Sequence, residues 1–142
     1  MNDARLLTDP GEDALRRAAA LVEGEYWNEG VPLERLVRAF RASTAVVVAV
    51  DPAGEVVATA RALSDGVRSA WVGDVCVAKS WRGRGLGKAV TRTLLEHPML
   101  RDTDRVRLNT RDAQTLYERF GFVATVGEKR PYPSVEMVLR RR

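Results

Sequence analysis

Cysteine and histidine are nearly absent from this chain, and their scarcity removes several kinds of chemistry. Cys76 is the only cysteine and His97 the only histidine among 142 residues. A single cysteine excludes an internal disulfide and a metal site built from cysteines, and a single histidine excludes most zinc clusters and hydrolytic triads. We therefore expect chemistry that needs no metal ion.

Long apolar runs are also missing. No stretch approaches eighteen apolar residues, and residues 1–10 are acidic and polar where a signal peptide would be basic and then apolar. The chain has no internal repeats, and its length suits one hydrophobic core better than two. We expect a single domain over residues 1–142, located in the cytoplasm and not bound to a membrane.

Basic residues outnumber acidic ones, with a net charge of +4 and a pI of about 9.7. They are spread along the chain, apart from a glycine-rich loop near residue 83 and the run 140–142. Nucleic acid would suit this balance, and small acidic ligands suit it equally well. Both classes of ligand therefore stay open at this point.

The pattern of apolar residues predicts an alternation of helices and strands. Asp9, Pro10 and Glu12 resemble the N-cap, first residue and capping-box acid of a helix that Gly24 ends. A second helix follows Pro32, and a third follows the glycine loop and ends before Pro98. We expect strands at residues 4–8, 44–50, 55–63, 68–78, 105–109, 122–126 and 134–139.

The glycine loop is the first motif with chemical content. It follows the strand that ends near Ala78 and opens a helix, and it contains Gly83, Gly85 and Gly87 together with Lys79, Arg82, Arg84 and Lys88. Glycines in this context let several backbone N–H groups point at one anion, and the four cations favour a ligand with several negative charges. The spacing fits neither the nucleotide-triphosphate loop nor the dinucleotide fingerprint.

The second motif lies near the end of the chain. Ala113, Leu116, Tyr117 and Phe120 recur at helical spacing. Asp112 can cap the start of this helix and Gly121 its end. The result is a helix with one apolar face.

These two motifs resemble those of the GNAT superfamily of acyl-CoA-dependent N-acyltransferases, and the order of elements resembles it over essentially the whole chain. The matching stretches are Arg82-x-x-Gly85-x-Gly87 after a strand, and Ala113-x-x-Leu116-Tyr117-x-x-Phe120-Gly121-Phe122. The resemblance implies an α+β fold with a mostly antiparallel sheet, splayed parallel fourth and fifth strands, and helices on both faces.

The resemblance also implies acetyl-CoA as co-substrate. The pyrophosphate would bind the glycine loop, and the pantetheine arm would pair with the strand edge at Val75–Val77. The cofactor-binding residues implied are Val75, Cys76, Val77, Arg82, Gly83, Arg84, Gly85, Leu86, Gly87, Lys88 and Asn109. The family often has Asn three residues before the alanine of its last helix, whereas this chain has Thr110 there with Asn109 beside it.

Tyr117 is the residue that the resemblance implies as general acid. The departing CoA thiolate needs a proton, and a phenol with a pKa near 10 is close to matched to a thiol. Periodicity alone predicts a core tyrosine at this position. The two roles remain open at this stage.

A general base is harder to assign, because an amine acceptor must lose a proton before it attacks. Asp74 is the best-placed acid by sequence and our candidate for a catalytic role, Glu25 is a comparable candidate, and a water chain is a third. We expect Cys76 to be a small buried hydrophobe and His97 to cap a helix end. The acceptor contacts that we expect are Glu25, Tyr26, Trp27, Trp71 and Tyr132.

The function implied is an N-acetyltransferase that transfers the acetyl group of acetyl-CoA to a primary amine by direct attack in a ternary complex. Two other functions compete with it: a basic nucleic-acid-binding module and a CoA-binding regulator without catalysis. Steep salt dependence of binding to arbitrary DNA would favour the first of these. A monomer and a homodimer are both compatible with the sequence.

Overall fold

The computed structural model describes residues 3–126 and 133–141. Two compact units divide the chain, residues 1–110 and residues 111–142. Among the described residues, no helix combines the length and the apolar character that crossing a membrane requires.

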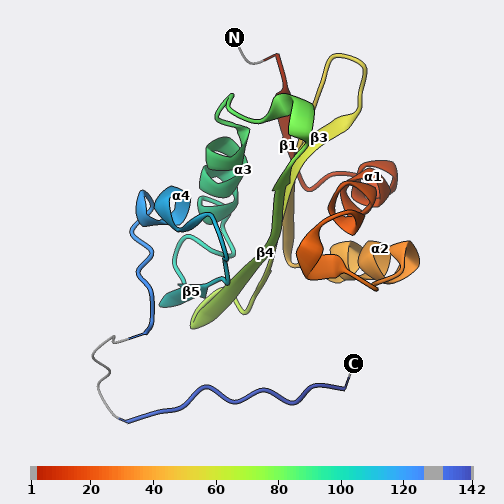
Figure 1. Ribbon diagram of the computed structural model, residues 1–142. Coiled ribbons are helices and arrows are strands. Elements are labelled where there is room, and N and C mark those ends of the chain that lie inside the picture. Colours follow the sequence, from red (N-terminus) through yellow and green to blue (C-terminus); the bar gives the residue numbers. More distant parts are fainter. Residues whose placement is uncertain (1–2, 127–132, 142) are drawn as a thin grey trace. The chain divides into compact units, whose positions relative to one another are not determined.

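The first unit is built on a five-stranded mixed sheet whose strands follow one another in chain order (Figure 1). Neighbouring strands from β1 to β4 pair antiparallel, and β4 and β5 pair parallel. The strands are β1 (Arg5–Thr8), β2 (Ala45–Val50), β3 (Val56–Ser64), β4 (Ser69–Val77) and β5 (Arg105–Arg107).

Helices cover both faces of this sheet, with α1 and α2 on one side and α3 on the other (Figure 1). The bounds of the helices are α1 (Glu12–Glu23), α2 (Leu33–Ala42) and α3 (Leu86–Leu95), and two short 3₁₀ helices are η1 (Tyr26–Asn28) and η2 (Lys79–Trp81). All six residues of β2 are buried, because alternate side chains pack into the two cores on either side. The predicted strand at residues 44–50 is thus present and is covered on both faces.

The fourth and fifth strands separate soon after they meet. Their pairing ends at Trp71 opposite Arg107, whereas β4 continues to Val77. A register shift in the β3–β4 ladder leaves Ala60 facing both Asp74 and Val75, and Asp74 has φ of +51°. This bulge bends β4 where its partner has ended, so the sheet is mostly antiparallel with a splayed parallel pair, as predicted.

In the second unit, α4 (Gln114–Glu118) is shorter than the predicted helix. The predicted cap at Asp112 is wrong: Ala113 is the N-cap, and no side chain caps the helix. The predicted end is confirmed: Gly121 has φ of +90°, its N–H bonds to Glu118 O, and the N–H of Phe122 bonds to Tyr117 O. These are the two bonds of a Schellman motif, which needs a residue that tolerates a left-handed conformation.

Two further predictions from the sequence are wrong. Asp9 does not cap α1: its backbone is left-handed and its N–H bonds to Val46 O, so the chain is still leaving the sheet and Gly11 becomes the N-cap. Residues 122–126 and 134–139 form no strands in the part of the chain that the structure describes. Alternating apolar residues favour a strand only where an edge is available to pair with, and in the described part of the chain neither segment belongs to the sheet.

Candidate active site

The glycine loop lies between η2 and α3 and presents backbone N–H groups at the start of a helix. Gly83 and Gly85 have φ of +79° and +82°, a conformation in which L side chains are strained. Gly85 is the N-cap of α3, and no side chain caps that helix. The first N–H groups of a helix have no partners within it, so this end suits an anion.

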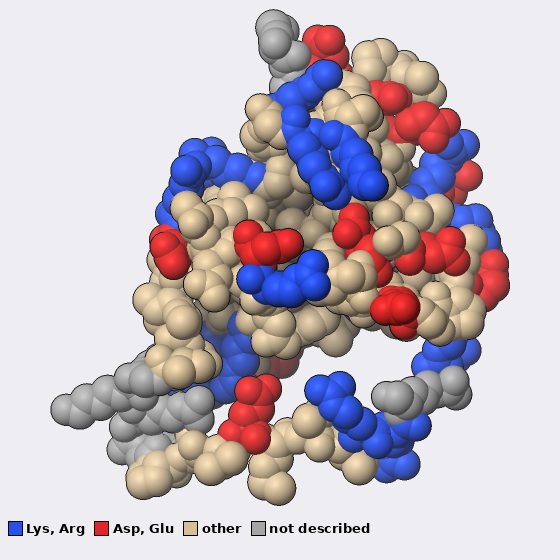
Figure 2. Space-filling view, in the orientation of Figure 1, with Lys and Arg blue, Asp and Glu red and all other residues tan. Residues whose placement is uncertain are grey.

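Basic side chains gather around this loop. Lys79, Arg82, Arg84 and Lys88 are all exposed, and the guanidinium of Arg84 lies 4.5 Å from the centroid of the Trp81 ring. Figure 2 shows Lys and Arg side chains near the top of the molecule, where η2 lies in Figure 1, above a hollow in the surface. Backbone N–H groups and cations together fit the two charged phosphates of a pyrophosphate.

Beside the loop, the last residues of β4 have an open edge. Ala78 N donates to Val57 O of β3 over 2.8 Å. Because successive residues of a strand point their N–H and C=O groups to opposite edges, those of Val77 face away from β3. Since β5 ends opposite Trp71, that edge has no neighbouring strand among the described residues. An extended amide chain such as pantetheine could pair there.

Glu25 reaches this edge from the segment between α1 and η1. Its Oε1 accepts a hydrogen bond from Cys76 Sγ at 3.1 Å and lies 3.5 Å from a terminal nitrogen of Arg82. The Nε of Arg82 also donates to Val77 O over 3.1 Å. One carboxylate, one thiol and one guanidinium therefore meet at the end of β4.

Burial raises the pKa of the Cys76 thiol to about 12, and the neighbouring Glu25 carboxylate adds to the effect. The side chain packs in the core between the sheet and α1 and α2, while its backbone belongs to β4. At neutral pH the group is a thiol that donates to Glu25. Such a thiol is a poor nucleophile, and the observed burial confirms the prediction of a buried cysteine.

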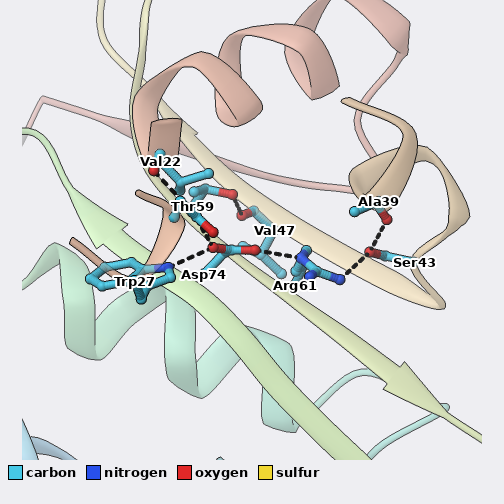
Figure 3. A network of polar contacts seen from close by, with 9 residues as sticks. Val22, Trp27, Ala39, Ser43, Val47, Thr59, Arg61 and Asp74 are labelled. Carbon is cyan, nitrogen blue, oxygen red and sulfur yellow. Dashed lines mark hydrogen bonds and ion pairs between the residues drawn. The ribbon is translucent and has the colours of Figure 1, made fainter. Parts of the chain in front are cut away.

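Asp74 lies at the bulge of β4 at the centre of a polar network (Figure 3). One carboxylate oxygen accepts from Trp27 Nε1 at 2.7 Å and from Asn28 Nδ2 at 2.9 Å. The other accepts from Arg61 Nε at 2.7 Å. Only 5% of the Asp74 side chain is exposed, so the three donors hold a carboxylate that water barely reaches.

Arg61 extends this network to two aromatic rings. Its guanidinium lies 5.6 Å from the ring centroids of both Phe40 and Trp71, and a terminal nitrogen donates to Ser43 Oγ over 3.4 Å. The ring of Trp71 lies over Gly73 of β4, so that a Cβ added to Gly73 would lie 2.4 Å from the nearest ring atoms. Gly73 is therefore required by the position of that ring.

Three aromatic side chains on the same face of the sheet are partly exposed: Tyr26 and Trp27 at 42% each and Trp71 at 37%. The rings of Tyr26 and Trp27 meet edge to face at 5.0 Å. The network of Asp74 and Arg61 connects Trp27 to Trp71. Of the predicted acceptor contacts, the structure brings Trp27 and Trp71 to one network and Glu25 to the end of β4, while Tyr132 lies outside the described residues.

The other predicted residues occupy separate positions. Tyr117 is buried in the second unit, with its ring 5.9 Å from that of Phe122. Asn109 is exposed and follows β5. His97 accepts a hydrogen bond from Met99 N at Nδ1, so it stabilises the turn after α3 by a different contact from the predicted helix cap.

Sequence reasoning missed Arg61, Asn28 and Gly73. Arg61 could have been found, because it is the one charged residue within the apolar strand β3, and a charge there needs a partner. Nothing in the sequence distinguishes Asn28, whose amide joins Val22 O to Asp74. The need for Gly73 depends on the position of Trp71, which only the structure shows.

The comparison with known proteins agrees with this geometry. The family model described as the acetyltransferase (GNAT) domain matches residues 42–124. A GNAT-family protein from Xanthomonas campestris has 31% identity and a TM-score of 0.75, and the match covers 94% of this chain and 95% of that one. The chain belongs to the GNAT family of acetyltransferases.

Other solved structures extend the similarity of this GNAT chain. A protein from Deinococcus radiodurans with a provisional assignment as an acetyltransferase has 28% identity and a TM-score of 0.72, covering 98% of this chain and 89% of its own. Glucosamine-6-phosphate N-acetyltransferase from Arabidopsis thaliana shares the fold at 18% identity, with a TM-score of 0.67 over 97% and 99% of the two chains. No curated protein matches this chain.

Proposed function

We propose that this protein is an acetyl-CoA-dependent N-acetyltransferase of the cytoplasm that acetylates a primary amine by direct attack in a ternary complex. The observation that carries the proposal is the open edge of β4 beside a cationic glycine loop, in a chain of the GNAT family. Membership of the family supports the class of reaction, and the positions of the residues or the two motifs support the roles proposed below.

Acetyl-CoA supplies the activated acetyl group as a thioester. In this proposal the N–H groups of residues 83–88 hold the pyrophosphate, and the cations of the loop balance its charge. The backbone of Val75, Cys76 and Val77 pairs with the pantetheine arm, and Asn109 is a further contact. Backbone N–H groups on the open edge also polarise the thioester carbonyl.

Of the two carboxylates offered as general base, the geometry favours Glu25. The oxygens of Asp74 are already engaged by three donors, which makes that carboxylate better suited to holding Trp27 and Arg61 in place. Glu25 is more accessible, with 24% of its side chain exposed, and lies at the end of β4. We propose that Glu25 binds the acceptor ammonium and takes its proton, directly or through one water.

We propose Tyr117 as the general acid that gives its hydroxyl proton to the departing thiolate, a role that rests on the motif around it. Tyr26, Trp27 and Trp71 are proposed to contact the acceptor, and Tyr132 is a fourth candidate. Because the Cys76 thiol stays protonated, no acyl group passes to the enzyme in this scheme.

Two measurements test the proposal in sequence. Acetyl-CoA should raise the melting temperature, while adenosine should do so far less because it lacks the pyrophosphate. A panel of small amines, amino acids and peptides with free N-termini is then screened for release of CoA thiol. A melting temperature that does not respond to acetyl-CoA would refute the cofactor assignment. Binding without thiol release for any amine would favour a CoA-binding regulator.

A further inference from the structure

Arg82 connects the glycine loop to the carboxylate proposed as base. It is the C-cap of η2 and the first residue of the Arg82-x-x-Gly85-x-Gly87 motif. The Nε of Arg82 donates a hydrogen bond to Val77 O over 3.1 Å, and a terminal nitrogen lies 3.5 Å from Glu25 Oε1. The same guanidinium thus contacts the edge of β4 and the segment between α1 and η1.

Both of these contacts would compete with a bound cofactor. The carbonyl of Val77 lies on the open edge, where an extended amide chain would need it as an acceptor. A pyrophosphate in the glycine loop would also attract the guanidinium, and it carries more charge than one carboxylate. A guanidinium held at Val77 O and Glu25 has fewer N–H donors left for a phosphate, so contacts with the phosphates compete with the contact to Glu25.

Glu25 has a second contact that does not depend on Arg82. The Cys76 thiol donates to the same Oε1 at 3.1 Å, and the raised pKa of this thiol keeps its proton in place. If Arg82 turned away, Glu25 would keep its position at β4 and lose its cationic partner. An acceptor ammonium could then take the place of the guanidinium.

We propose that Arg82 couples the two substrates: without acetyl-CoA it pairs with Glu25 and Val77, and with acetyl-CoA it turns to the phosphates and leaves Glu25 for the amine. This inference rests on the proposed function, because it takes acetyl-CoA as the ligand of the loop. More than half of the Arg82 side chain is exposed, so water and salt weaken its ion pair. The coupling is therefore a few-fold effect and not an absolute gate.

The test measures the dissociation constant of acetyl-CoA by calorimetry at low ionic strength, without any acceptor. Glu25→Gln removes the competitor for Arg82, so binding should tighten by about two- to fivefold. The tightening should disappear when Glu25→Gln is combined with Arg82→Gln. It should persist when Glu25→Gln is combined with Arg84→Gln, a matched loss of charge in the same loop.

Glu23→Gln is the control for overall charge, because Glu23 is an exposed acid at the end of α1. It should change binding less than Glu25→Gln does. An unchanged dissociation constant in Glu25→Gln would overturn the coupling, and so would equal tightening in the Arg82→Gln and Arg84→Gln backgrounds. Failure of the unaltered protein to bind acetyl-CoA would instead refute the proposed function.

Discussion

The hydroxyl of Tyr117 is the smallest group to which we assign a role. Tyr117→Phe keeps the ring, and with it the contact with Phe122, and removes only the oxygen. If that hydroxyl protonates the leaving thiolate, kcat should fall by about 100- to 10,000-fold, with acetyl-CoA affinity and melting temperature nearly unchanged. Steady-state kinetics with the best acceptor from the amine screen measure this.

An acyl donor with a more acidic thiol provides the control for Tyr117→Phe. Such a thiol departs without a proton donor, so it should restore part of the rate of the variant and barely accelerate the parent. Turnover within a few-fold of the parent, under conditions where chemistry limits the rate, would show that Tyr117 is a core residue and not the acid.

Cys76 should be chemically inert in the folded protein. With a pKa near 12 instead of the ordinary 9.0, its thiolate fraction at pH 8 is lower by about a thousandfold, and burial adds a steric barrier. We expect a disulfide reagent to label it at least about a thousandfold faster in urea than in buffer. Cys76→Ala should keep most acetyl-transfer activity, whereas an acetylated Cys76 in mass spectra would contradict direct attack.

The same pKa sets a dependence of stability on pH. Between pH 9 and about 12 the unfolded chain loses the Cys76 proton while the native chain keeps it, so the free energy of unfolding decreases as pH rises. The decrease from this group is at most about 1.4 kcal/mol per pH unit. Urea unfolding from pH 8 to 10 should therefore show a steeper decline in the parent than in Cys76→Ala.

At the scale of elements, two matched glycine variants distinguish a role of the glycine loop in binding from the effect of backbone strain on stability. Gly85 and Gly54 both have φ above +80° and open space where a Cβ would lie, but Gly54 is in the turn between β2 and β3. A valine at either position should cost about 1–3 kcal/mol of stability. Only Gly85→Val should abolish the rise in melting temperature with acetyl-CoA, because its side chain blocks the approach of phosphate to the backbone. A full shift in Gly85→Val would remove the loop from the site.

The Asp74 network joins η1, β3 and β4, and it should contribute more to stability than surface ion pairs do. Asparagine tolerates the positive φ of Asp74, so Asp74→Asn removes the charge with little backbone strain. Breaking this nearly buried pair should cost about 3–5 kcal/mol, because the Arg61 guanidinium, only 13% exposed, loses its partner.

Asp104→Asn is the matched control for Asp74→Asn, since Asp104 pairs with Arg68 at an exposed position. Its cost should stay below about 1 kcal/mol. Urea denaturation of the two variants and the parent gives both values. A similar small loss in the two variants would mean that the network does not hold η1 to the sheet.

Sequence patterns sufficed where the structure is determined locally. The strand-to-helix context of the glycine loop, the three strands β2 to β4 and the cap at Gly121 were all predicted from nearby residues, and all are present. Interactions between distant segments were beyond such patterns: the Arg61 contact with Asp74 and the Arg82 contact with Glu25 each depend on how elements pack. The strand predictions after Gly121 failed for the same reason, because a strand needs a partner that the sequence of one segment does not specify.

At the scale of the whole molecule, the prediction of a single domain leads to one unfolding transition. The second unit, residues 111–142, is shorter than the roughly 40 residues below which a chain rarely folds without disulfides, metals or oligomerisation. We therefore expect its structure to depend on the first unit. Both should lose their structure together in urea, and acetyl-CoA should move both transitions to higher urea by the same amount.

The burial of Cys76 allows this cooperativity to be measured with two probes. All three tryptophans lie before residue 110 and report on the first unit. In a Thr115→Cys variant, an environment-sensitive fluorophore attached to the introduced thiol reports on the exposed side of α4, because Cys76 is buried and protonated. Tryptophan and label should give coincident midpoints and slopes, and the unlabelled parent checks that the label does not change the tryptophan curve. A label transition at lower urea that does not respond to acetyl-CoA would show that residues 111–142 unfold independently, and the single-domain prediction would be wrong.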